Sequence, residues 1–143
     1  MIQACEPGLR KHCNEFPLLH DASLRLRHDI ARLGGDDAVP AVDGVDICSR
    51  AEAFGAAYVI LGSQLGAQVL RPAVTRDLGI SGDSLTYFAG PKEVGKAWKS
   101  FAGSLAKWDE EASEDLNDVT LRFAVNLFEA FTRAFGREGL DAL

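Results

Sequence analysis

The apolar segment AFGAAYVILGSQLGAQVL, residues 53–70, constrains the fold of this chain more than any other feature. It is apolar on nearly all sides, which is typical of a helix buried in the middle of a protein. A buried strand over residues 57–61 is the alternative, but the length and the alanine content of the segment favour a helix. We therefore expect a helix from about Cys48 to Leu78, with Gly79 as its C-cap.

Two glycines inside this segment, Gly62 and Gly66, are four residues apart and therefore lie on one face of the helix. Each costs about 1 kcal/mol relative to alanine in a helix interior, so something must require the missing side chains. Either another helix crosses closely at these positions, or a flat ligand lies against the bare backbone and the helix is broken or bent there. Ser63, between the two glycines, offers a hydroxyl to a freed carbonyl or to a water.

The first residues of the chain contain several helix breakers. Pro7, Gly8 and Pro17 predict an irregular lead-in over residues 1–17, with a short helix over residues 8–15 as the alternative. No part of this stretch has the basic start and apolar run of a signal peptide.

A helix is expected to follow the lead-in. Asp21 or Ser23 is suited to cap its N-terminus, and an apolar stripe continues to about Leu33. The pair Gly34-Gly35 then ends it. Residues 36–47 are rich in Gly, Asp and Pro, and we interpret them as a loop.

The second half of the chain also has helical periodicity. Apolar residues recur at intervals of three and four over residues 92–108 and again over residues 113–135, and residues 83–88 suggest a short helix or turn. Strand signals are nearly absent. A chain of 143 residues is long enough for one core but not for two, so we predict a single all-α domain spanning residues 1–143.

Charge and composition exclude several classes of function. The net charge of -6, without a basic stripe, argues against a nucleic-acid partner. No apolar run reaches the roughly 18 residues expected of a membrane span. The three cysteines form no CxxC pair, which supports neither a disulfide framework nor a zinc site. We expect a soluble, cytoplasmic protein.

Four segments together resemble one family. AAYVILGSQLGAQVL resembles the distal helix of bacterial haem oxygenases, where a Tyr-Val-Leu-Glu-Gly-Ser run is followed by Leu-Gly-Gly. LHDASLRLRHDIARLGG is similar to the family's helix before the loop that leads to the distal helix. LTYFAGPKEVGKAWKSFAGSL looks like its aromatic, Gly-turn and Trp-containing segment, and NLFEAFTRAF like its closing helix. The order and spacing agree from about Leu18 to Phe135, which implies a haem-oxygenase-like helical bundle, shortened at its N-terminus.

The resemblance implies a chemistry. Haem oxygenases use haem as both substrate and cofactor, and open it with O₂ and supplied electrons to biliverdin, carbon monoxide and iron. The electron donor would be a ferredoxin, a flavodoxin or a similar reductase. Carried over by position, Gly62 and Gly66 would press bare backbone against the haem, and Ser63 would lie near the distal water network.

The resemblance also implies haem contacts outside the catalytic turn. Tyr58 falls one turn earlier and would face the pocket, with a packed aromatic as the alternative, and Ala67 replaces the second glycine of Leu-Gly-Gly. Lys99 falls where the family places a basic propionate contact, and Lys96 is a nearby substitute, although lysines usually belong to a solvated face. Phe128 corresponds to an aromatic that lines the haem, with core packing as an equal alternative.

The chain departs from the family pattern in its iron ligand. The proximal histidine lies on the family's first helix, and the resemblance here begins after that helix. His12, His20 and His28 are the only histidines, and none lies in a family iron-ligand context, so no metal ligand is assigned. The usual Glu before the first glycine is Leu61 here, which removes one charged anchor.

Three interpretations follow. The reading frame begins too late and the natural protein is a longer, normal enzyme, or the chain is a shortened relative that binds tetrapyrrole weakly or binds a protein partner. The shortened relative should expose an apolar slot at Leu127, Phe128 and Phe131, which invites homodimerisation. In the third interpretation the chain is a helical bundle in which Gly62 and Gly66 serve only close helix packing.

Overall fold

The computed structural model describes residues 2–35, 45–90 and 92–139, with the side chains of Leu18, His20 and residues 134–139 excepted. Over these ranges the chain is helical and contains no strand, which confirms the predicted all-α class. The elements are, in chain order, α1 (Ile2–His12), η1 (Pro17–Asp21), α2 (Ala22–Arg32), α3 (Arg50–Leu78), η2 (Gly82–Ser84), α4 (Thr86–Ala89), α5 (Val94–Glu111) and α6 (Glu114–Gly139).

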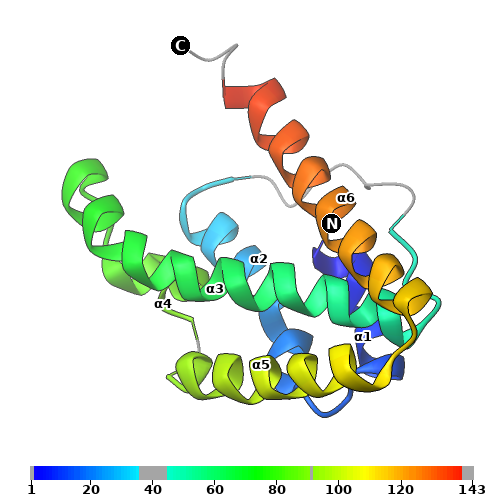
Figure 1. Ribbon diagram of the computed structural model, residues 1–143. Helices are drawn as coiled ribbons and strands as arrows, with labels where there is room; N and C mark the ends of the chain where they lie inside the picture. Colours follow the sequence, from blue (N-terminus) through cyan, green and yellow to red (C-terminus); the bar gives the residue numbers. More distant parts are fainter. Residues whose placement is uncertain (1, 36–44, 91, 140–143) are drawn as a thin grey trace.

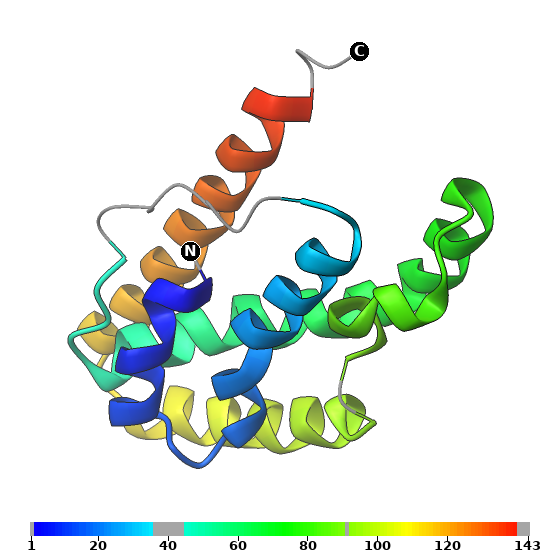
Figure 2. The ribbon, with the colours of Figure 1, turned by 180° about the vertical axis from the view of Figure 1, so that it is seen from behind.

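Helix α3 runs across the middle of the molecule and contacts α1, α4, α5 and α6 (Figure 1). Helix α5 lies alongside α3, and α6 crosses the N-terminal half of α3 and then rises away from the other helices. The view from behind shows α1 and α2 in front of α3, on the side that faces away from the viewer in Figure 1 (Figure 2). The apolar segment at residues 53–70 therefore forms the central helix, as its composition predicts.

Both ends of α3 are fixed by local interactions. The Ser49 hydroxyl accepts a hydrogen bond from the Glu52 backbone N–H at 3.2 Å, and the Glu52 carboxylate accepts one from the Ser49 N–H at 2.9 Å. This capping box satisfies backbone donors that the first turn leaves free. At the other end Gly79 adopts a left-handed conformation with φ 64°, which confirms the predicted C-cap.

The prediction of a broken helix at Gly62–Gly66 is wrong, because α3 continues without interruption from Arg50 to Leu78. A glycine keeps its backbone N–H and C=O, so it stays in the helical hydrogen-bond ladder at a cost of about 1 kcal/mol. The burial of the first half, where Phe54 and Ile60 are at most 1% exposed, offsets that cost. Burial ends near Ala67, and the second half of α3 is largely exposed.

The prediction that residues 1–17 form an irregular lead-in is also wrong, because most of this segment is helical. Residues 2–12 form α1, and the interior position of Pro7 removes only one backbone N–H from its ladder. Ile2, Cys5 and Leu9 recur at intervals of three and four and are buried in the core, which stabilises the helix despite the proline. Gly8 is needed for packing, because a Cβ there would collide with the Ile47 side chain.

The remaining boundaries differ from the expected ones by a few residues. Asp21 occupies the N-cap position of α2 but makes no side-chain capping bond. Gly34 ends that helix region with φ 77°, as expected. Of the predicted loop at 36–47, residues 36–44 lie outside the described residues, and residues 45–47 have no regular structure.

Helices α3 and α6 approach each other closely where they cross at Gly55. A Cβ on Gly55 would stand 2.5 Å from the Thr120 carbonyl oxygen and 3.1 Å from the Ala124 backbone nitrogen. The neighbouring Phe54 packs on Phe101 and Trp108 of α5, with ring centroids 5.9 Å and 5.1 Å apart. The core is thus centred on the first turns of α3.

We predict that Gly55→Ala lowers the free energy of unfolding by about 2 kcal/mol, because the added methyl group forces the two backbones apart. Gly103→Ala is the matched control, since Gly103 lies inside α5 with nothing within 4 Å of its Cβ position. This control should gain about 0.5–1 kcal/mol from helix propensity. Urea denaturation followed by circular dichroism measures both, and equal stability of the two variants would contradict the crossing.

Candidate functional site

The two glycines that define the candidate site are not required by helix packing. The nearest atom to a Cβ on Gly62 is the Trp98 ring, 3.6 Å away, which is ordinary contact. A Cβ on Gly66 has no atom within 4 Å. Within the described ranges, no second helix presses its backbone on either glycine, so close helix packing does not explain them. Close packing instead requires Gly55, which the sequence analysis did not single out although it lies in the same apolar segment.

Gly62 and Gly66 belong to an open face of α3. We define the outer face of α3 as Tyr58, Gly62, Gly66 and Val69, which follow one another at intervals of three and four residues. Tyr58 is 43% exposed and Val69 is 78% exposed. The Tyr58 ring packs against Trp98 of α5 at a centroid distance of 5.6 Å. Bare backbone and aromatic edges thus lie side by side on this face.

Two apolar depressions adjoin the outer face. A recess of about 530 Å³ lies between Tyr58 and α6, and its α6 wall contains Leu121, Val125 and Phe128. A groove of about 690 Å³ separates α5 from α6, with α3 as its floor. Tyr58 and Leu121 line both depressions, so the two are continuous with each other.

Two residues predicted to act with the glycines point elsewhere. The Ser63 hydroxyl donates to the Ile60 carbonyl at 2.8 Å and lies 3.1 Å from the Tyr87 hydroxyl on α4. Burial raises the pKa of Tyr87, so its hydroxyl stays protonated at neutral pH. Ala67 is buried, with 6% exposure. Ser63 and Ala67 therefore contact the interior and not the outer face.

The predicted propionate contacts are solvent-exposed. Lys96 forms an ion pair with Glu93 at 2.9 Å, and both side chains are largely exposed. Lys99 is exposed one residue after Trp98, which packs against the outer face. Neither lysine lines the recess or the groove.

Of the three α6 residues that we expected to form an exposed apolar slot, one is exposed. Phe128 is 52% exposed and lines the recess beside Tyr58. Leu127, however, is 3% exposed, and Phe131 packs against the core. The expectation that these two lose their cover is wrong, because they lie on the side of α6 that faces the body of the molecule.

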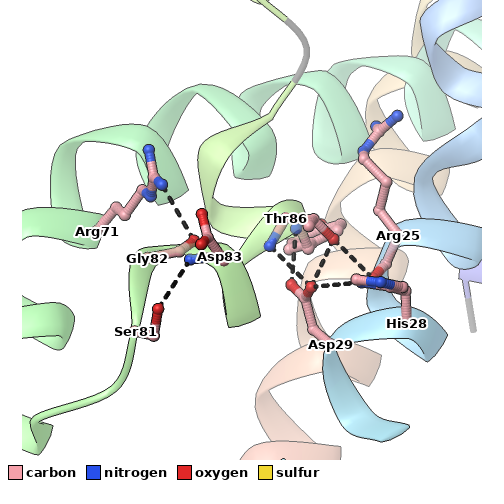
Figure 3. A network of polar contacts seen from close by, with 9 residues as sticks. Arg25, His28, Asp29, Arg71, Ser81, Gly82, Asp83 and Thr86 are labelled. Carbon is pink, nitrogen blue, oxygen red and sulfur yellow. Dashed lines mark hydrogen bonds and ion pairs between the residues drawn. The ribbon is translucent and has the colours of Figure 1, made fainter. Parts of the chain in front are cut away.

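A polar network on the other side of α3 has a structural role that the sequence analysis did not predict. The Asp29 carboxylate accepts hydrogen bonds from the backbone N–H groups of Thr86 and Tyr87, each at 2.7 Å (Figure 3). These are the first donors of α4, whose own N-cap residue makes no side-chain bond. Asp29 on α2 therefore caps α4 from a distance, and no local sequence motif signals it.

Of the three histidines, the two whose side chains the structure describes lie away from this site. His12 is on α1 and His28 is on the exposed side of α2, 3.6 Å from Asp29. Neither lines the recess or the groove, and the side chain of His20 lies outside the described residues. In the part of the chain that the structure describes, no group of three or more His, Cys, Asp or Glu side chains is placed to hold a metal ion.

No protein-family model matches the chain, and no curated protein or solved structure matches it. The resemblance to haem oxygenases and the site residues carried over from it therefore stay predictions. So does the cytoplasmic location. Helix α3 is long and apolar enough to cross a membrane, but 56% of the relevant window is buried inside the fold, and the core helix of a soluble protein passes the same test.

We predict that the three thiols differ sharply in reactivity. Burial raises the pKa of Cys5 to about 11 and that of Cys13 to about 12, which lowers the fraction of reactive thiolate. Cys48 is free and exposed. Titration with a chromogenic disulfide reagent at pH 8 should therefore release about one equivalent from the native protein and three after denaturation. Rapid release of three equivalents from the native protein would contradict the packing of α1.

Proposed function

We propose that this chain is a haem-oxygenase-like protein that binds haem on the outer face of α3, with the backbone of Gly62 and Gly66 against the porphyrin plane. One observation carries the proposal: α3 holds two glycines that no helix crossing explains, with only the Trp98 ring at 3.6 Å from a Cβ on Gly62 and open space at Gly66. Each glycine lowers helix stability by about 1 kcal/mol. A flat ligand that needs bare backbone accounts for both.

The walls of the site suit a porphyrin. Tyr58 and Trp98 border the glycines with aromatic rings, and the recess beside them is lined almost entirely by apolar atoms. Ligand pockets are typically concave and mostly apolar, with few polar groups. Burial of this exposed apolar surface by the macrocycle is favourable at roughly 25 cal/mol per Å².

The charged edge of a haem requires cations near the mouth of the site. Lys99 would serve best, because it follows Trp98 on α5 and its long side chain is exposed. Lys96 already pairs with Glu93 at 2.9 Å and would have to exchange that carboxylate for a propionate. Exposed ion pairs contribute little to binding, typically below about 1 kcal/mol, so we expect these contacts to orient the ring more than to hold it.

The site does not offer the iron ligand that the resemblance to haem oxygenases requires. Bound haem would supply the redox iron for ring opening to biliverdin, carbon monoxide and iron, with O₂ and electrons from a ferredoxin, flavodoxin or reductase. The residues lining the recess and groove include no histidine or cysteine. We therefore propose haem binding as the function of these residues, and ring opening as a second step that depends on an axial ligand supplied from elsewhere.

We predict that Gly66→Leu weakens hemin binding at least about tenfold, because a branched side chain holds the ring off the backbone. Gly103→Leu is the matched control, since Gly103 is an equally open helix position but lies on α5 and not on the outer face of α3. Both variants should fold at least as stably as the parent chain, because leucine favours helix over glycine. Hemin titration at the Soret band measures the affinities. Equal affinities of the two variants would remove the outer face from the proposal.

We also predict that reductant and O₂ convert no haem to biliverdin in the unaided chain, because the residues lining the recess and groove include no histidine, the iron ligand that the resemblance requires. Free imidazole, which can occupy an iron coordination position, should shift the Soret band of the bound haem. Turnover without imidazole would show that the chain holds the iron itself. Absence of any Soret change on hemin addition would refute the proposal and favour a helical module without tetrapyrrole.

A further inference from the structure

Helix α6 exposes a line of large apolar side chains. We define the α6 stripe as Leu121, Val125 and Phe128, which are 62%, 47% and 52% exposed. Their spacing of four and three residues places them on one side of the helix. Both ribbon views show the C-terminal part of α6 projecting beyond the other helices (Figures 1 and 2). The stripe is therefore accessible to another molecule.

Beside the stripe, the charged side chains that the structure describes lie on one flank of α6. At 100° per residue, Asp115, Asp118, Arg122, Glu129 and Arg133 all follow the stripe in the same rotational direction. Within one copy the last four form two exposed ion pairs, Arg122 with Asp118 at 3.8 Å and Arg133 with Glu129 at 3.5 Å. From Asp118 to Arg133 the order of charges is thus negative, positive, negative, positive.

We propose that a second copy of this chain covers the α6 stripe, with the two α6 helices antiparallel and a two-fold axis near Val125. In that register Leu121 faces the partner's Phe128, and Val125 faces the partner's Val125. A two-fold axis perpendicular to both helices brings the same flank of each copy together, and such isologous contacts are the commonest form of homodimer.

The charge order supports this occupant and this direction. In the antiparallel register Asp118 faces the partner's Arg133, and Arg122 faces the partner's Glu129, so these four charges meet opposite charges. In a parallel two-fold dimer opposite flanks meet, so the charged flank of each copy would face the uncharged flank of its partner and none of these pairs would form. Pairing of the charges therefore favours the antiparallel arrangement. The sequence of α6 is therefore complementary to itself in one direction.

The dimer proposal rests on other residues than the haem proposal. The haem proposal depends on Gly62 and Gly66 of α3, whereas the dimer depends on α6 and is tested without hemin. The two proposals share the recess, because Tyr58 and the α6 stripe line it together. A partner helix on the stripe would close the open side of that recess.

The first experiment compares Leu121→Glu with Leu24→Glu by sedimentation velocity over a range of concentrations. Both leucines are exposed helix positions, at 62% on α6 and 67% on α2. Leu121→Glu should raise the dimer dissociation constant at least about tenfold, because it places a carboxylate against the partner's Phe128. Leu24→Glu should leave it unchanged, and circular dichroism checks that both variants fold. A parent chain that stays monomeric at millimolar concentration, or equal dimerisation of the two variants, would overturn the proposal.

The second experiment tests direction by charge reversal. Asp118→Lys and Arg133→Glu should each weaken self-association about five- to tenfold, because each sets like charges together twice per dimer. Mixing the two variants should restore association. In the mixed dimer the introduced lysine faces the introduced glutamate, and the second pair is the original Asp118 with Arg133. In a parallel dimer the charged flanks of the two copies lie on opposite sides of the contact, so each single reversal would leave self-association unchanged. Unchanged self-association of both single variants, or failure of the mixture to associate more tightly than either variant alone, would rule out the antiparallel register.

Discussion

The crossing of α3 and α6 at Gly55 is the contact on which the rest of the arrangement depends. The Thr120 carbonyl oxygen and the Ala124 amide occupy the space that any larger residue would need, so the two backbones come into close contact there. Next to this crossing, Phe54 packs on Phe101 and Trp108 and so positions α5 as well. Beyond the crossing, α6 diverges from α3 and rises away from the other helices (Figure 1).

That divergence explains why the outer face of α3 is open. If α6 ran alongside α3 for its whole length, Gly62 and Gly66 would be covered and their glycines would be explained by packing. Instead Gly62 meets only the edge of Trp98, and Gly66 meets nothing within 4 Å. The glycines of α3 thus have different surroundings: Gly55 permits a backbone contact, Gly62 lies next to the Trp98 ring, and Gly66 leaves bare backbone at the surface.

The opposite side of α3 has no such freedom. The Asp29 carboxylate holds the first turn of α4, and Tyr87 of that turn reaches Ser63 on α3 at 3.1 Å. Arg71 further anchors the preceding turn by donating to the Gly82 carbonyl at 3.1 Å (Figure 3). Buried polar groups that are satisfied in this way fix one local arrangement. Helix α3 is therefore held by hydrogen bonds on one side and accessible on the other.

The sequence by itself determined the all-α class, the central place of residues 53–70 and the Gly79 cap, because periodicity and capping act within a few residues of each other. Only the tertiary structure decided that residues 2–12 are helical, since the burial of Ile2, Cys5 and Leu9 against distant helices outweighs Pro7. It also decided that Gly55 and not Gly62 marks the crossing, and that Ser63 turns inward. The sequence does not reveal which glycine lies at a helix crossing, because that depends on which distant segment packs against it.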